Sequence, residues 1–199
     1  MHLFHFDKYH IFLKLFKFCF LLFVLQKDIV FSNEKTGAEK VNFITANPFS
    51  FFHIITDLEN QESQNAYGIL RFPNSGIRNQ YPLILGVNGS KNWADHHLEY
   101  MEMYRKMGFA TFEIQSFNSR NVNSTVGDQT TVTTAMMILD SYKALEVLGR
   151  DKRIDIDNVA ITGWSLGGGV ALFSAWEPLI ESIGIKERFK LILLFIHLV

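Results

Sequence analysis

One stretch of the sequence limits how this chain can fold more than any other. Residues 159–173, VAITGWSLGGGVALF, form an apolar run with four glycines around one serine, Ser165. A glycine inside a helix costs about 1 kcal/mol relative to alanine, so glycines at this density need a structural reason. The apolar residues before Ser165 predict a buried strand, and those after it predict a helix. We therefore expect a strand that turns abruptly into a helix at Ser165.

Strand-like and helix-like runs alternate along the rest of the chain. Strands are expected over residues 46–57, 65–73, 81–89, 109–117, 157–163 and 189–199. Helices are expected over residues 95–107, 131–150 and 166–176, the first with Leu98, Met101 and Met107 on its buried side. Strands that alternate with helices predict right-handed crossovers and a sheet covered on both faces. The predicted fold class is therefore α/β, with a mostly parallel sheet and helices on both faces.

The composition is that of a globular protein, and it argues against some partners. The chain has 199 residues, enough for one domain of ordinary size. Hydrophobic residues make up 48% and charged residues 20%, which is a globular and not a disordered profile. The formal net charge is −1 and the chain has no basic stripe, so we expect no nucleic-acid partner.

The first 31 residues differ from the remainder. Three lysines precede the apolar run FCFLLFVL at residues 18–25, and a polar stretch begins at Ser32. A basic leader, a short apolar core and a polar exit are typical of a secretory signal peptide. We expect residues 1–31 to be the signal peptide of a secreted or periplasmic protein, with an uncleaved membrane anchor as the alternative. Residues 32–40 are then a polar linker, and residues 41–199 are the folded domain.

The single cysteine, Cys19, lies inside this leader. The mature domain would then hold no cysteine. Disulfides, thiol catalysis and cysteine metal sites are therefore not expected in it.

The residues around Ser165 fit a known catalytic turn. Gly163-Trp164-Ser165-Leu166-Gly167 matches the G-x-S-x-G nucleophile elbow. Side chains at the two outer glycines would collide with the neighbouring strand and helix, and Gly168 and Gly169 would let that helix approach the sheet closely. The turn lifts the serine hydroxyl to a helix N-terminus, where backbone N–H groups favour negative charge. Such a serine can attack a carbonyl carbon while an oxyanion forms.

Two backbone N–H groups are candidates for binding that oxyanion. Leu166, directly after the serine, would supply one. Ser90 would supply the other, because Val87-Asn88-Gly89-Ser90 ends the central apolar strand, and the loop after that strand holds the motif's second donor. An ordinary turn is the alternative interpretation of Ser90. The predicted site therefore consists of the Ser165 nucleophile, the N–H groups of Ser90 and Leu166, and the elbow glycines Gly163 and Gly167.

At these residues the chain resembles the α/β-hydrolase fold and, within it, the dienelactone hydrolase family. The likeness is strongest over residues 83–176. It rests on VNGS after the third strand, GFATFEIQSFNSR after the first helix, and DNVAITGWSLGGGVAL around the serine. The resemblance implies hydrolysis of a small-molecule carboxylic ester or lactone through an acyl-enzyme on Ser165. It implies no metal and no organic cofactor.

Four positions outside the elbow bear on this resemblance. Phe117 and Arg120 match the family's turn in which an arginine follows an Asp-Ser-Phe sequence. Gln115 stands where that turn usually has aspartate, and Asn88 stands where the oxyanion motif usually has histidine. These two departures weaken any transfer of substrate preference. Trp164 and Phe117 could line an apolar acyl site, although both could equally be core residues.

The acid and the base that activate the serine are harder to place. The fold orders them as Ser, then Asp or Glu, then His. The acidic residues after Ser165 are in or just after the expected helix, and the only later histidine is His197; these acidic residues are Glu177, Glu181 and Glu187. Asp95, His96 and His97 precede the serine and open a helix, so we interpret them as capping and solvated residues and not as a metal site.

The resemblance also predicts further strands after residues 189–199. We therefore expect an incomplete α/β-hydrolase domain with its last strands missing, and little turnover from the 199-residue chain itself. The alternative is a non-catalytic remnant or binding module that lacks the acid and base of the triad. The sequence predicts no oligomeric state.

Overall fold

The computed structural model describes residues 37–74 and 78–195, which belong to one compact unit. The expected leader, Cys19 and His197 lie outside these residues. Among the residues that are described, no helix combines the length and the apolar character needed to cross a membrane.

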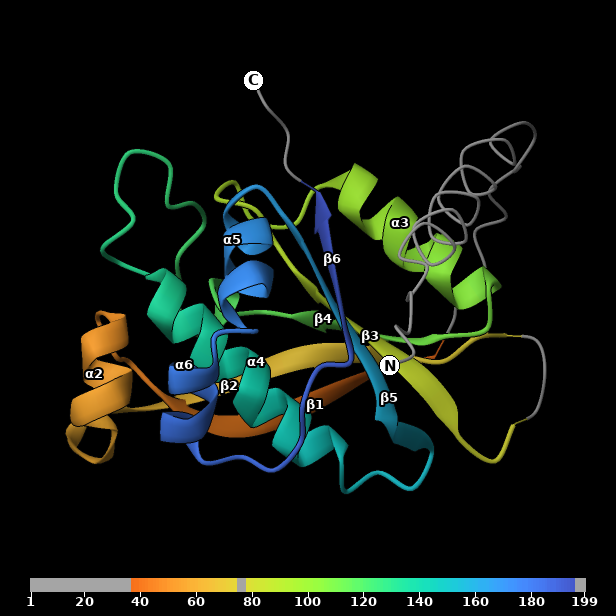
Figure 1. Ribbon diagram of the computed structural model, residues 1–199. Coiled ribbons are helices and arrows are strands. Elements are labelled where there is room, and N and C mark those ends of the chain that lie inside the picture. The colour runs from red at the N-terminus through yellow and green to blue at the C-terminus, as the bar shows by residue number, and fades with distance from the viewer. Residues whose placement is uncertain (1–36, 75–77, 196–199) are drawn as a thin grey trace, which may run out of the picture. The chain divides into compact units, whose positions relative to one another are not determined.

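Six strands form one sheet with the order β1-β2-β4-β3-β5-β6 (Figure 1). The strands are β1 (Ala38–Ala46), β2 (Ser63–Arg71), β3 (Tyr81–Val87), β4 (Ala110–Ile114), β5 (Ile154–Trp164) and β6 (Leu191–Phe195). The pairs β4–β3, β3–β5 and β5–β6 are parallel, whereas β1–β2 and β2–β4 are antiparallel. This confirms the prediction of a mostly parallel sheet.

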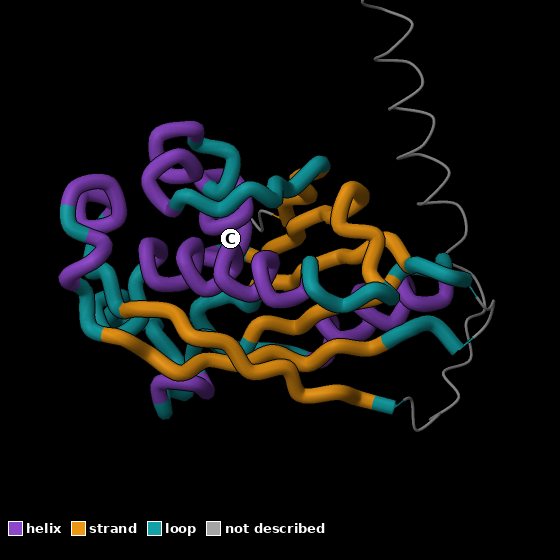
Figure 2. The backbone as a smooth tube through the Cα atoms, turned by 90° about the horizontal axis from the view of Figure 1, so that it is seen from below, coloured by secondary structure: helices purple, strands orange, loops and turns teal. Residues whose placement is uncertain are grey.

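The helices cover both faces of this sheet. They are α2 (Phe51–Thr56), α3 (Asp95–Lys106), α4 (Thr134–Leu148), α5 (Leu166–Phe173) and α6 (Glu177–Ile183), with short 3-10 turns η1 (Leu58–Asn60) and η2 (Asn118–Arg120). In Figure 2 the strands form one twisted layer with several helices along one side. In Figure 1, α4, α5 and α6 lie together, and α3 lies apart from them.

Alternate residues of β3 show that α3 covers the opposite face. Leu83 and Leu85 belong to the large apolar core beneath α4, α5 and α6. Ile84, between them, belongs to a second cluster with Met101 and Tyr104 of α3. Because neighbouring side chains in a strand point to opposite faces, the two clusters lie on the two sides of the sheet.

The strand predicted over residues 46–57 is wrong. β1 ends at Ala46, and residues 51–56 form the helix α2. Phe51, Ile54 and Ile55 recur at helical spacing, and Ile54 is buried. Ser50 precedes them in the extended conformation of an N-cap, with φ of −143° and ψ of 171°.

The polar linker expected up to residue 40 is also too long, because β1 begins at Ala38. The charged residues of this segment face solvent from within a strand. Glu39 pairs with Arg153 at 2.7 Å, and the Lys40 ammonium lies 3.9 Å from the centre of the Tyr67 ring. Charge in this stretch therefore reflects an exposed strand face and not a linker.

The buried side of α3 differs from the predicted one. Met101 is buried as expected, but Leu98 and Met107 are 40% and 42% exposed. The buried positions are His97, Met101, Tyr104 and Arg105. Helix α6 was not predicted as a separate element; it ends at Ile183, and its C-cap residue Gly184 has a φ of +71°.

Candidate active site

The strand-to-helix junction expected at Ser165 is present. Ser165 lies between β5 and α5, is exposed, and has a φ of 52° with a ψ of −111°. A non-glycine residue in such a region costs on the order of 1–3 kcal/mol. Its N–H donates to the carbonyl oxygen of Phe195 at 3.0 Å, and its own carbonyl accepts from the N–H groups of Gly168 and Gly169 at 2.9 and 3.2 Å. The turn is therefore held from both sides.

The two elbow glycines are required for space. A Cβ on Gly163 would overlap the carbonyl oxygen of Gly167 and lie 2.7 Å from the nitrogen of Gly168. A Cβ on Gly167 would overlap the carbonyl oxygen of Val87 and lie 2.6 Å from that of Asn88. The first turn of α5 thus packs directly on backbone.

The other two glycines of the motif do not have the role that the sequence suggested. A Cβ on Gly168 would meet the carbonyl oxygen of Gly163 at an ordinary 3.4 Å, and a Cβ on Gly169 would meet nothing within 4 Å. Close approach of helix and sheet therefore depends on Gly163 and Gly167 alone in this motif.

The end of β3 lies directly beside the turn. Val87 of β3 is paired with Gly163 of β5, so the residues after both strands emerge next to each other. A Cβ on Gly89 would lie 3.2 Å from the carbonyl oxygen of Trp164 and 3.8 Å from the Cβ of Ser165. The structure therefore brings together the two loops from which the oxyanion donors were predicted.

Ser90 is in a tight turn that the next loop holds in place. The N–H of Asn92 donates to the carbonyl of Gly89 at 2.9 Å, which closes the turn around Ser90. The carbonyl of Ser90 accepts from the N–H of Thr125 at 2.9 Å and from the hydroxyl of Ser124 at 3.0 Å. Within the described ranges 37–74 and 78–195, the Ser90 N–H donates to no protein acceptor.

Leu166 is the first residue of α5, so its N–H has no acceptor within the helix. Among the residues the structure describes, this N–H donates to no other protein group either. Two backbone donors without protein acceptors thus lie in the two neighbouring segments that meet at the exposed Ser165.

His97 lies at this site although the sequence interpretation made it a solvated residue. Asp95 and His96 are exposed as expected, but His97 is only 5% exposed. Its Nδ1 accepts from the N–H of Ala94 at 3.2 Å, which caps α3. Its ring stacks on Trp164 with centroids 4.6 Å apart. Spacing from His97 to Met101 to Tyr104 is helical, and it is the sequence signal that could have placed His97 on the buried face.

The ring of His97 is held neutral near the turn. Burial, and secondarily the neighbouring His96, lower the pKa of His97 from 6.5 to about 4. Its Cε1 lies 3.8 Å from the Cβ position of Gly89, the same position that lies 3.8 Å from the Cβ of Ser165. His97 and Ser165 therefore both lie close to Gly89.

Two aromatic residues considered as acyl-site walls are core residues. Phe117 is fully buried in the large core, and Trp164 is 5% exposed in the second cluster. Gln115 is largely buried and accepts from the Asn118 amide at 2.6 Å. The buried Asn88 donates from its Nδ2 to the carbonyl of Gly89 at 2.9 Å.

Arg120 is fully engaged in a buried clamp. Its Nη1 and Nη2 donate to the two carboxylate oxygens of Asp140 at 2.7 and 3.0 Å. Its remaining bonds reach the Asn47 side chain and the carbonyls of Ser116 and Ala46. The guanidinium therefore links η2, α4 and the end of β1, and all of its N–H groups are used in these hydrogen bonds, so none is left for a substrate.

The downstream candidates for acid and base are not assembled at Ser165 by any described contact. Glu177 and Glu181 are exposed on α6, and Glu187 follows it. Residues 166–195 contain no histidine. Across the described part of the chain, no group of three or more His, Cys, Asp or Glu side chains could hold a metal ion.

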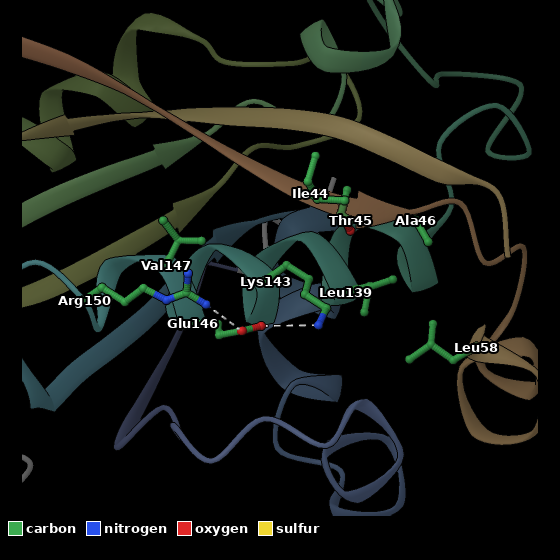
Figure 3. Close-up of a pocket in the computed structure, with 9 residues that line it drawn as sticks. All are labelled: Ile44, Thr45, Ala46, Leu58, Leu139, Lys143, Glu146, Val147 and Arg150. Carbon is green, nitrogen blue, oxygen red and sulfur yellow. Dashed lines mark hydrogen bonds and ion pairs between the residues drawn. The ribbon is translucent and has the colours of Figure 1, made fainter. Parts of the chain in front are cut away.

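A groove of about 490 Å³ lies elsewhere, between β1 and α4 (Figure 3). Its walls are mainly aliphatic, with Ile44, Leu58 and Leu139 among them. Its charges are paired internally, since Glu146 contacts both Lys143 at 3.3 Å and Arg150 at 3.0 Å. Ser165 is not among its lining residues, so we do not connect it with the candidate active site.

Comparison with known proteins bears on the fold. No protein-family model and no curated protein matches the sequence. A candidate carboxylesterase from Lactobacillus plantarum WCFS1 is similar with a TM-score of 0.55 and 12% identity, over 80% of this chain and 59% of that one. A chain named "m3DLH" is similar with a TM-score of 0.50 and 15% identity, over 70% of this chain and 53% of that one.

A dienelactone hydrolase from Anabaena variabilis ATCC 29413 gives a TM-score of 0.48 and 17% identity, over 72% of this chain and 59% of that one. Taken with the sheet order and the junction at Ser165, the likeness to the first structure shows that the chain has the α/β-hydrolase fold. The chain spans little more than half the length of these solved structures.

Proposed function

We propose that this chain carries the nucleophile and oxyanion-binding part of a serine esterase site. The observation that carries the proposal is the placement of Ser165. It is an exposed serine in a strained turn, beside two backbone N–H groups that have no protein acceptor in the described residues. Attack on a carbonyl needs an exposed hydroxyl beside hydrogen-bond donors, and strained residues are concentrated at functional sites.

The proposed chemistry is acyl transfer to water. The Oγ of Ser165 forms a bond to the carbonyl carbon of a carboxylic ester or lactone, and the carbonyl oxygen becomes an oxyanion. The N–H groups of Ser90 and Leu166 donate to that oxyanion. The C–O bond to the leaving alcohol then breaks, and water later releases the acid from the acyl-enzyme. The resemblance to dienelactone hydrolases favours small ester or lactone substrates.

A base must take the proton of Ser165 for turnover. By the order of the fold, this base and its acid partner follow the serine in the chain. The first experiment should therefore report on the nucleophile without needing deacylation. A fluorophosphonate does so, run at raised pH: the Oγ proton passes to hydroxide of the solvent, the Oγ–P bond forms, fluoride leaves, and the reaction stops at the phosphonyl adduct.

We expect a fluorophosphonate to add one phosphonyl group to the folded 199-residue chain, located at Ser165 by peptide mass spectrometry. The Ser165→Ala variant should remain folded and unlabelled. A folded wild-type chain that takes no label, or takes it equally in Ser165→Ala, would sink the proposal.

A matched pair of substitutions isolates the Ser90 donor. Ser90→Pro removes the backbone N–H, and Ser90→Ala keeps it while removing the hydroxyl. Proline is tolerated at the second position of many tight turns, which is where Ser90 lies. Loss of one oxyanion donor costs about 10²–10³ in rate, so Ser90→Pro should label that much more slowly. Ser90→Ala should label at nearly the wild-type rate; equal slowing of both variants would exclude the backbone role.

A further inference from the structure

We propose that His97 is a third oxyanion donor of this site, in which its Nε2–H donates to the oxygen that becomes negative when Ser165 attacks. The inference rests on the proposed function, because without a nucleophilic Ser165 there is no oxyanion to bind. It differs from that function in assigning a side chain of α3 to the reaction.

The first observation is that the imidazole ring of His97 lies close to Ser165. The Cβ position of Gly89 is 3.8 Å from the Cε1 of His97 and 3.8 Å from the Cβ of Ser165. The Cε1 of His97 and the Cβ of Ser165 therefore lie no further apart than the sum of these two distances. Since Gly89 carries no side chain, nothing at that residue fills the space between them.

Three contacts fix the direction of the ring. Trp164 stacks on one face at 4.6 Å with an interplanar angle of 28°. Trp93 and His96 meet it edge-on at 5.9 and 4.1 Å. An imidazole held this firmly presents one defined edge, which is what a preorganised donor needs.

The hydrogen bond to Ala94 decides which nitrogen carries the proton. Nδ1 of His97 accepts from the N–H of Ala94 at 3.2 Å, so Nδ1 is unprotonated. A neutral imidazole then has its proton on Nε2. This tautomer makes His97 a hydrogen-bond donor at Nε2 and prevents it from acting there as a base for Ser165.

Nε2 is free to meet a substrate. It makes no hydrogen bond within the described part of the chain, and it is not among the buried polar atoms that lack a partner. A ring that is 5% exposed therefore keeps its one free polar atom open. Burial, and secondarily the neighbouring His96, disfavour a charged imidazolium, and the pKa of His97 is lowered to about 4. The donor stays neutral at neutral pH.

The tautomer is tested on the unmodified chain. In ¹⁵N-histidine spectra, His97 should show a protonated Nε2 and an unprotonated Nδ1 at neutral pH. Its Nε2 proton should shift downfield after phosphonylation of Ser165, because the adduct's oxygen accepts it. A proton on Nδ1, or an Nε2 signal unchanged in the adduct, would overturn the inference whatever any variant does.

Kinetics supply the second test. His97→Phe keeps an aromatic ring against Trp164 and removes the donor, and His53→Phe is the control at a histidine of α2, which the site does not include. We expect His97→Phe to lower the maximal phosphonylation rate by up to about 10²-fold with little change in non-covalent probe affinity. His53→Phe should leave both quantities unchanged.

The outcomes separate the two proposals. If wild type is labelled at Ser165 and folded His97→Phe labels within twofold of it, the donor role of His97 is wrong and the proposed function stands. A parallel fall of probe affinity and thermal stability would make His97 a packing residue only. If wild type is not labelled, the proposed function fails and this inference fails with it.

Discussion

The glycines on the two sides of Ser165 look equivalent in the sequence and are not equivalent in the molecule. A Cβ on Gly163 or on Gly167 would overlap backbone atoms of the neighbouring segments. Gly168 and Gly169, the next two residues, have room for a methyl group. The run GGG therefore joins one residue required by packing to two that are not. Residue type alone did not distinguish them; the neighbouring strand does.

The comparison extends to Ser165 itself. The unfavourable backbone conformation in this turn is adopted by Ser165, whose φ is 52°. None of the four surrounding glycines has a positive φ. The glycines thus provide space, and the serine bears the strain. The strained conformation of Ser165, the residue proposed to react, therefore lowers the stability of the folded chain. Strain of this kind is common at functional sites.

The largest expected effect comes from adding a methyl group where there is no space. Gly163→Ala would place a Cβ onto the carbonyl oxygen of Gly167, with backbone on both sides. We expect the free energy of unfolding to fall by at least about 3 kcal/mol, since neither strand nor helix can move without the other. Urea denaturation measures this, and Gly168→Ala is the matched control. A Gly163→Ala chain as stable as wild type would mean that α5 can move away from the added methyl group. Gly163 would then be no more strictly required than Gly168.

A second effect comes from the side chain that closes on the turn. The pKa of His97 is about 4 in the folded chain, lowered chiefly by burial, against an ordinary 6.5. The unfolded chain therefore binds a proton more readily, and stability is fully present above about pH 6.5 and falls as the pH drops toward 4. The groups that face the ring are His96, Trp93, Trp164 and the N–H of Ala94.

The loss at the acid end should approach about 3 kcal/mol, which is 1.36 kcal/mol for each unit of pKa difference. Urea unfolding at a series of pH values measures it as the difference between wild type and His97→Phe. That difference should shrink as the pH falls. Parallel curves for the two chains would show that His97 titrates normally and is not held neutral.

A third, smaller effect separates strain from space. Ser165→Gly should raise the free energy of unfolding by about 1 kcal/mol, because relief of the positive φ outweighs the extra entropy of glycine in the unfolded chain. Ser165→Ala keeps a Cβ in the same conformation and should change stability little. Thermal and urea unfolding of the two variants, side by side, measure the strain. Equal stabilities would mean that the serine backbone is not strained.

Much of the fold was predictable where burial leaves a continuous signal. β3 and the second half of β5, residues 159–164, are nearly unbroken buried runs, and α4 has helical spacing over four turns, so these elements and the junction at Ser165 agree with the sequence predictions. β1 and α2 were not predictable in the same way. Charges on the solvent face of β1 hid its alternation, and the helical spacing of α2 extends over only six residues, too few to distinguish it from a strand.

The candidate site was predictable only in its local part. The elbow is a property of five consecutive residues, so its strand, turn and helix could be inferred. The helical spacing of His97 with Met101 and Tyr104 could have placed it on the buried face, but its stacking on Trp164, a residue distant in sequence, could not be inferred. Arg105 is buried on the same helix for a similar reason, since it donates to Thr111 of β4 at 2.8 Å and lies 3.6 Å from the Glu113 carboxylate of the same strand. The partners of such polar residues come from other elements and cannot be inferred from the spacing along one helix.

The smallest expected effect has the opposite sign. Gly169 is a helical residue of α5 with nothing within 4 Å of the Cβ position, so Gly169→Ala adds a methyl group without a clash. Alanine loses less backbone entropy than glycine on forming a helix, and we expect a gain of about 0.5–1 kcal/mol in the free energy of unfolding. Labelling of Ser165 should keep its wild-type rate. Urea denaturation and phosphonate labelling of this one variant measure both quantities.

Either departure would be informative about α5. A loss of stability would mean that α5 packs more tightly at Gly169 than the 4 Å of free space around its Cβ position indicates. A gain in stability with slower labelling would mean that Gly169 gives the first turn of α5 freedom that the reaction uses. Only a gain with unchanged labelling fits a glycine that is neither required for packing, as Gly163 and Gly167 are, nor strained, as Ser165 is.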